Sequence, residues 1–301
     1  MSAGQSLSRR RRLLVALAAA APWLTPSRTI AARRHDVRVI VGTDSERYRE
    51  AIDALRARYG VLPVDGKPHS LLRPTRPTAY LALGAEALRT ALDARLDAPV
   101  VCLFASRQAY EREAGSPSNP PSTAIHAEPA PSQQMRLISA LYKRPVRVGV
   151  LVSPDSAARE TSLREAAAAH GLLLEVSRTE PGDRLTRSLN RLPSVSVLLI
   201  FPDTSLYTPA SLRELLESTY RRRLPVIGFS AALVAAGTLA SAYTDMADTL
   251  FQLDRLLDQL GSGRLPGPRY PDFWRVAIND SVARSLDVVI DDAVRSLGDR
   301  P

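Results

Sequence analysis

The segment VSVLLIFPDTSLYTPASLRELLESTYRRRLPVIGF, residues 195–229, sets the fold class. An apolar run rich in β-branched residues (195–201) leads through a polar loop into an amphipathic stretch (210–223). A second short apolar run (225–229) follows. Continuous apolar runs of this length are typical of parallel strands that are covered on both faces. The segment therefore predicts a strand–helix–strand unit within a parallel sheet.

The same unit recurs on both sides of this segment. The further apolar runs predicted as strands are 37–42, 78–84, 99–105, 146–153, 172–178 and 238–243. The helical stretches between them are 46–59, 86–96, 157–170, 185–192 and 231–236. A polar, proline-rich segment at 115–122 divides the strands into two series. We expect an α/β fold of two doubly wound parallel-sheet lobes, joined by a multi-strand hinge.

The C-terminal part does not repeat the unit. It contains one amphipathic helix (246–260), a turn segment and one lone strand (274–279). Such elements suit a chain that crosses back to the first lobe and then returns to the second. The predicted domains are 1–31 for an export signal, 36–123 plus 246–268 for lobe one, and 124–245 plus 269–297 for lobe two.

Residues 1–31 have the composition of a secretory signal. Four arginines (9–12) precede an apolar run (13–24), and Thr29, Ile30 and Ala31 offer a peptidase site. The run is shorter than the ~20 residues that span a bilayer. We expect a periplasmic protein whose signal is cleaved, by either the general secretory or the twin-arginine route. No cysteine near the signal could carry a lipid anchor. A basic tail on a cytoplasmic protein is the alternative.

Charge and composition argue against several other functions. The net charge is +9, and five of the arginines lie in 1–31, so the rest of the chain carries +4 without a basic stripe. Nucleic acid is therefore not an expected partner. Cys102, the only cysteine, lies in an apolar run and is predicted to be a buried strand residue. The four histidines are scattered, and GFSAA (228–232) lacks the second glycine of a hydrolase motif. We expect no cofactor, no metal and no enzymatic activity.

Candidate ligand-binding residues follow the predicted strands, because ligands of open α/β sheets bind beyond the carboxyl ends of the strands. They are Thr43, Asp44, Ser45, Tyr48, Gly84, Ala85, Ser153, Asp155, Asp203, Thr204, Tyr207, Phe229, Ser230, Tyr243 and Asp245. A carboxylate such as Asp203 or Asp245 could pair with an ammonium group, and Tyr207 or Phe229 could stack on a flat solute.

Each candidate also has a structural alternative. Residues 43–45 could cap the helix that follows them, and Asp245 could cap the helix that begins at Met246. Gly84 and Ala85 could form a simple turn, and the aromatic side chains could be packing residues.

Several stretches resemble one known family. VRVIVGTDSERYREAIDALRARYG (37–60), LALGAEAL (81–88), RVGVLVSPDS (147–156), residues 198–245 and RVAINDSVARSL (275–286) resemble ABC-transporter substrate-binding proteins with the type I periplasmic-binding fold. The resemblance implies capture of a small solute, with an amino acid as the candidate, in the inter-lobe cleft by hinge closure, and delivery to a membrane permease. It also implies a monomer without enzymatic activity.

Two stretches depart from the family pattern. SRQAYEREAG (106–115) stands where relatives show Asp-Pro, and Thr123-Ala124-Ile125 stands where they show Thr-Gly-Val. Two alternatives therefore stay open. The same scaffold could serve as a periplasmic sensor or accessory subunit of a membrane signalling or transport system, or it could be a lobe pair that binds no ligand.

Overall fold

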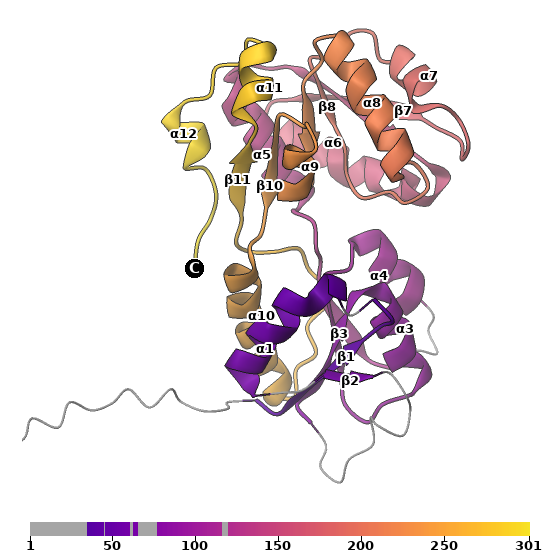
Figure 1. Ribbon diagram of the computed structural model, residues 1–301, viewed down its shortest axis with the longest axis vertical. Helices are drawn as coiled ribbons and strands as arrows, with labels where there is room; N and C mark the ends of the chain where they lie inside the picture. The colour runs from indigo at the N-terminus through magenta and orange to yellow at the C-terminus, as the bar shows by residue number, and fades with distance from the viewer. Residues whose placement is uncertain (1–34, 45, 61–62, 66–76, 116–119) are drawn as a thin grey trace, which may run out of the picture. The chain divides into compact units, whose positions relative to one another are not determined.

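The described residues build two separate β-sheets, as the two series of apolar runs predict (Figure 1). The computed structural model describes residues 35–44, 46–60, 63–65, 77–115 and 120–301. The predicted export signal lies outside these ranges. Within them, no helix has both the length and the apolar character needed to cross a membrane.

The first sheet is parallel throughout, with the strand order β2-β1-β3-β4-β5. Its strands are β1 (Val37–Val41), β2 (Pro63–Asp65), β3 (Ala79–Leu83), β4 (Val100–Leu103) and β5 (Ser122–Ile125). The chain leaves β1 toward β2 on one side and then continues to β3 on the other. This reversal places a topological switch point at the carboxyl ends of β1 and β3, where ligands of such sheets bind.

Helices cover both faces of this sheet. They are α1 (Arg49–Tyr59), α3 (Gly84–Asp93), α4 (Arg107–Ala114) and α10 (Met246–Gly261), with a short 3₁₀ turn η1 (Glu46–Tyr48) before α1. α1 and α10 pack against one face, with Leu55 and Leu253 fully buried, and α3 packs against the other. Cys102 in β4 is fully buried, as predicted, and burial raises the pKa of its thiol to about 12.

The second sheet has the order β11-β10-β9-β8-β6-β7. Its strands are β6 (Arg147–Val152), β7 (Leu173–Arg178), β8 (Val197–Leu199), β9 (Val226–Gly228), β10 (Ala240–Tyr243) and β11 (Arg275–Ile278). All pairs are parallel except β10 with β11, which is antiparallel. The chain continues from β6 to β7 on one side and then to β8 on the other side of β6. The switch point of this sheet therefore lies between β6 and β8.

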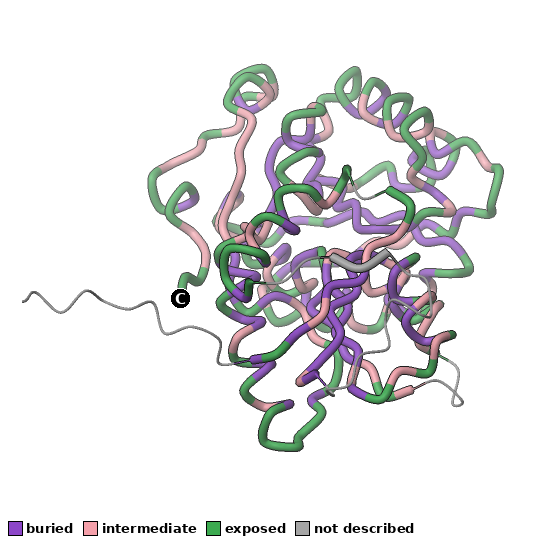
Figure 2. Tube along the Cα trace, turned by 60° about the horizontal axis from the view of Figure 1, so that its bottom comes forward, coloured by how far each residue is buried: buried purple, intermediate pink, exposed green. Residues whose placement is uncertain are grey.

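The second sheet is likewise covered on both faces. Its helices are α5 (Pro131–Tyr142), α6 (Glu160–Ala169), α7 (Leu185–Asn190), α8 (Pro209–Arg221), α9 (Ala231–Ala235), α11 (Asp280–Ser285) and α12 (Asp292–Arg295), with a 3₁₀ segment η2 (Pro154–Arg159) before α6. α5 and α6 pack against one face, and α7 and α8 against the other. Buried residues concentrate along the strands and exposed ones on the outer turns of the helices (Figure 2).

Three segments carry the chain between the two sheets. These crossings are residues 126–130, 244–245 and 262–274. Hydrogen bonds join the first and third, from His126 N to Arg269 O (2.9 Å) and from Arg269 N to Ala124 O (2.9 Å). The Thr244 hydroxyl donates to Phe273 O (2.7 Å), which joins the second to the third. The crossings therefore form one bonded unit.

The sequence-based prediction of the fold class is confirmed, since parallel strands and helices alternate in both sheets. The sequence patterns did not predict β5, α4 or α5. β5 is a four-residue strand beside the proline-rich segment, and α4 is a short helix of eight polar and small residues with one tyrosine. The exact boundaries of the two lobes stay a prediction.

Candidate functional site

At the switch point of the first sheet, an aromatic ring lies over a glycine. Gly84 has a φ of +86°, and a Cβ atom there would lie 2.1 Å from the Tyr48 hydroxyl. Only glycine fits this position. The Tyr48 ring lies 6.2 Å from that of Phe104, which follows β4 with a φ of +61°. A non-glycine residue with positive φ is strained and often marks a functional site. Burial raises the pKa of Tyr48.

The alternative role of residues 43–45, capping of the helix that follows, is not seen at α1 for Thr43 or Asp44. Tyr48 is the N-cap of α1, and no described side chain accepts a bond from its first turn. Thr43 bonds instead to the Glu86 carboxylate, through its amide N (3.2 Å) and its hydroxyl (3.0 Å). Asp44 is exposed, and Ser45 lies outside the described residues. The η1 turn separates Thr43 and Asp44 from the first turn of α1.

At the switch point of the second sheet, the predicted residues bind one another. The Asp203 carboxylate is only 2% exposed and accepts bonds from the Ser153 hydroxyl (2.7 Å) and the Ser205 amide (3.0 Å). The Ser205 hydroxyl donates to Asp155. Thr204 N donates to the Gln108 side chain of α4 (3.3 Å). Asp203 is thus satisfied within the protein, and the structure favours a structural role for it.

The remaining candidates divide between packing and cap roles. Tyr207 packs beside the core against α7 and α8. Its buried hydroxyl has no partner among the described residues, and burial raises its pKa. Ser230 caps α9 by accepting from Leu233 N (3.3 Å). Ala85 and Tyr243 are half-buried at the ends of β3 and β10.

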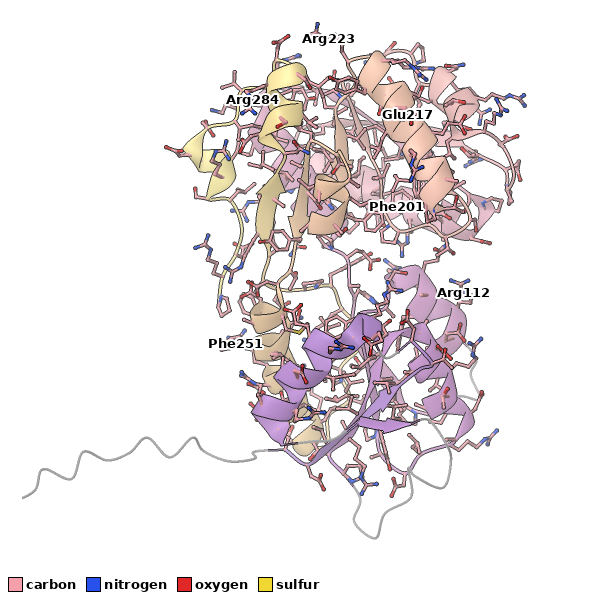
Figure 3. The ribbon with its side chains drawn as sticks, in the orientation of Figure 1. Arg112, Phe201, Glu217, Arg223, Phe251 and Arg284 are labelled. Atoms are coloured by element: carbon pink, nitrogen blue, oxygen red, sulfur yellow. The ribbon has the colours of Figure 1, made fainter. Side chains whose placement is uncertain are left out.

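Phe229 lines a narrow pocket near the crossings, which we call the Phe229 pocket. It is lined by Glu128, Pro129, Pro131, Gln134, Arg159, Leu163, Leu199, Phe201, Pro202, Phe229 and Tyr270. Its free volume, about 20 Å³, holds little more than one water molecule. Phe201 follows β8 at the carboxyl edge of the second sheet (Figure 3). The lining residues of the pocket include residues from the first and third crossings and from the ends of β8 and β9.

A buried ion pair forms one wall of the Phe229 pocket. The Arg159 guanidinium lies 3.4 Å from Glu128 Oε1 and 5.6 Å from the centre of the Phe201 ring. Glu128 also accepts two bonds from Arg107 N at the start of α4, at 3.0 and 3.2 Å. Burial raises the pKa of Glu128, and the Arg159 charge opposes this shift. Glu128 therefore connects α4 to the η2 segment through the first crossing.

A larger pocket lies beside it, which we call the Asp245 pocket. It encloses about 250 Å³ and is lined by Phe104, Ile125, His126, Ala127, Thr244, Asp245, Met246 and Thr249. The alternative role predicted for Asp245 is confirmed, because its carboxylate accepts from Asp248 N (2.8 Å) and caps α10. The carboxylate is also one-third exposed and lies 2.9 Å from Arg275 Nε. A cap role and a ligand role are therefore compatible for this residue.

His126 lies between the two pockets. Its ring makes edge-on contacts with Tyr110 (5.8 Å between centroids) and with Tyr270 (5.2 Å), which lines the Phe229 pocket. The ring is buried, and burial, with the Arg107 charge as the next cause, lowers the pKa of His126 to about 4. The imidazole is neutral at pH 7, with one donor and one acceptor nitrogen.

Solved structures of solute-binding proteins have the same fold. A ligand-free, open substrate-binding protein with adhesive properties from Clostridium difficile aligns with a TM-score of 0.64 and 12% identity, over 87% of this chain and 98% of that chain. An ABC domain in complex with L-Trp from Streptococcus pneumoniae aligns at 0.56 and 16% identity, over 86% and 97%. An arabinose-binding protein from Geobacillus stearothermophilus aligns at 0.52 and 14% identity, over 83% and 98%.

This chain has the type I fold of the ABC-transporter solute-binding proteins. The resemblance seen in the sequence is therefore confirmed at the level of the fold. No family model matches the sequence, and no curated protein matches it either. At 12–16% identity, the alignments with this solute-binding fold indicate architecture and leave the ligand open.

Several pocket residues are absent from the sequence-based set. They are Phe104, His126, Glu128, Arg159, Phe201 and Tyr270. His126 and Glu128 directly follow β5, so recognising that short strand would have identified both by the strand-end rule. Arg159 lies in a helical stretch and Tyr270 in a loop, where no local signal marks either. Of the two departures from the family pattern, Ala124 is a buried core residue of β5, whereas 106–115 forms α4 and touches Glu128.

Proposed function

We propose that this protein is the extracytoplasmic solute-binding component of an ABC importer. It captures a small solute at the crossings and closes around it by rotation of the two sheets with their helices. It then presents the closed form to a membrane permease. The composition of residues 1–31 supports export to the periplasm, and the protein acts there without catalysis.

One observation carries this proposal. Both pockets lie where the crossings meet the carboxyl ends of the strands, and each takes residues from more than one crossing or sheet. The Phe229 pocket combines Glu128 and Tyr270 of the crossings with Phe201 and Phe229 of the second sheet. A solute bound in the larger Asp245 pocket would touch Phe104 beside the first sheet and Thr244 and Asp245 of the second crossing. These groups move relative to one another when the hinge rotates, so binding energy can drive closure.

Thermal unfolding against a library of amino acids, amines, sugars and carboxylates tests the proposal. A ligand at a hundred times its dissociation constant adds about 2.7 kcal/mol to the free energy of unfolding. We expect at least one solute to raise the melting temperature and the Phe104→Ala variant, which removes the aromatic ring from the larger pocket, to weaken this response. Phe251→Ala, which truncates a more exposed ring on α10, is the matched control and should keep it.

A folded protein that responds to no solute would contradict the importer proposal and favour the lobe pair without a ligand. A response to solute combined with co-purification of a membrane kinase or cyclase, in place of a permease, would favour the sensor.

A further inference from the structure

The side-chain oxygens that line the Asp245 pocket act as hydrogen-bond acceptors toward a solute. The Thr244 hydroxyl donates its proton to Phe273 O (2.7 Å), and the Thr249 hydroxyl donates to Asp245 O (2.9 Å). A hydroxyl has one proton, so both retain only lone pairs for another molecule. A solute that binds here must bring its own donors.

The pocket also carries an excess of negative charge. Arg275 binds two carboxylates, Asp245 (2.9 Å) and Asp248 (2.9 and 3.0 Å), and Asp248 is almost fully buried. One guanidinium charge is thus shared by two carboxylate charges, so the three side chains together carry one net negative charge. Asp245 accepts one hydrogen bond from Asp248 N and forms an ion pair with Arg275. A carboxylate has about four lone-pair sites, so its exposed part can accept more.

His126 provides a second, independent indication of a ligand. The residue is 5% exposed and lines the Asp245 pocket, and its Nδ1 has no partner among the described residues. Buried polar atoms are nearly always paired, so an unpaired one suggests a missing partner. The ring is neutral at pH 7 because its pKa is about 4, so it adds no positive charge to the pocket.

Two cations near His126 are already paired with carboxylates. Arg107 binds Glu111 (2.6 Å), and Arg159 binds Glu128 (3.4 Å). Among the described residues that line the Asp245 pocket there is no lysine or arginine. A solute carboxylate would therefore meet the side-chain oxygens and the Asp245 charge, with no lysine or arginine in the pocket lining to pair with it.

We propose that the Asp245 pocket binds the cationic nitrogen of a small organic amine or guanidine that carries no carboxylate. The inference rests on the proposed solute-binding function and specifies its ligand class. Asp245 is the counter-ion, the Thr244 and Thr249 oxygens accept N–H bonds, and His126 completes the set of polar contacts. The Phe104 ring adds an aromatic surface of the kind that attracts cations.

Matched pairs of solutes test this inference on the full-length chain. Each amine is measured beside the amino acid that differs from it only by a carboxylate: ethanolamine and serine, tyramine and tyrosine, cadaverine and lysine, agmatine and arginine. Arabinose and succinate represent neutral and acidic solutes. We expect one or more amines to bind by calorimetry, at least tenfold tighter than the paired amino acid.

Two variants assign the binding to this pocket. Asp245→Asn keeps a helix N-cap of similar strength and removes the charge, so amine affinity should fall about tenfold to a hundredfold, as expected for a lost charge-assisted bond. His126→Phe should weaken it severalfold. Asp291→Asn, the same change at the N-cap of α12, is the control and should leave affinity unchanged.

The outcomes separate the inference from the proposed function. Tighter binding of an amino acid than of its amine, or binding of arabinose or succinate that is unaffected by Asp245→Asn, would uphold solute binding and overturn the assignment of an organic cation. Binding of none of these solutes or of the wider library would overturn both.

Discussion

At the scale of single residues, the site contains polar groups whose hydrogen bonds are made within the protein and others that have no partner among the described residues. Asp203, Ser153 and Ser205 bind one another, so the second switch point needs no ligand to be stable. His126 is different, because its Nδ1 has no partner among the described residues. Its ring nevertheless stays in place, held by Tyr110 and Tyr270. A buried imidazole with an unpaired nitrogen affects both the stability of the protein and its binding of a solute.

The stability of the protein should depend on the protonation of His126. Its pKa is about 4 in the folded protein, against 6.5 for the free side chain. Between these pH values the unfolded chain binds more protons than the folded one. The free energy of unfolding is therefore fully retained above pH 6.5 and falls by up to about 3 kcal/mol as the pH drops toward 4.

Urea unfolding of the wild type and of His126→Phe at pH 7 and pH 4.5 measures this contribution. Phenylalanine keeps the ring contacts and cannot titrate, so the variant should lose less stability on acidification. Because other carboxyl groups titrate in both proteins, the difference between the two curves isolates His126. Parallel curves would rule out the proposed protonation effect.

At the scale of elements, the first switch point is shaped by close packing of η1 against the start of α3. Gly84 is the first residue of α3, and its positive φ lets the chain turn from β3 into the helix. The Tyr48 hydroxyl occupies the space that any side chain at this position would need. The position of Tyr48, and through it that of Phe104, thus depends on one glycine.

Gly84→Ala should be far more destabilising than the same change at a glycine with similar backbone geometry. Gly182 has a φ of +88°, and a Cβ atom added there would have no described atom within 4 Å, whereas one added at Gly84 would lie 2.1 Å from the Tyr48 hydroxyl. Backbone strain costs about 1 kcal/mol at either site. We expect Gly182→Ala to lose about that amount and Gly84→Ala at least about 2 kcal/mol.

Chemical denaturation of both variants gives the two values. The double variant Tyr48→Ala, Gly84→Ala removes the obstructing ring, so its loss should be smaller than the sum of the two single losses. Equal losses for Gly84→Ala and Gly182→Ala would show that the contact with Tyr48 has no energetic effect.

At the scale of the whole molecule, the crossings determine how the two sheets can move. All three are joined by hydrogen bonds, so they would bend together. Two further sets of contacts link segments that flank the two sheets: the Thr204 amide donates to Gln108 of α4, and Glu128 of the first crossing joins Arg107 to Arg159. These contacts would change when the hinge rotates, and solute binding should shift their equilibrium.

Spin labels at Arg112→Cys on α4 and Glu217→Cys on α8 should report that rotation (Figure 3). Both side chains are exposed. Cys102 is fully buried with a thiol pKa of about 12, so it should not react with the label. We expect the distance distribution between the labels to shift when a bound solute is added.

The control pair, Glu217→Cys with Arg284→Cys, places both labels on helices of the second sheet. Its distances should not change with solute. An unchanged distribution for the first pair, in a protein that binds solute, would contradict hinge closure and leave binding intact.

The sequence by itself determined the fold class, the two sheets and most strands, because buried parallel strands need continuous apolar runs that are visible locally. It also identified Asp245 and Phe229, which directly follow such runs. Only the tertiary structure showed which candidates are free to bind. Asp203 is engaged by Ser153, fifty positions away, while His126, Glu128, Arg159 and Tyr270 come together from separate segments. Burial and pairing between distant residues depend on how the chain crosses between sheets, and no local pattern records that.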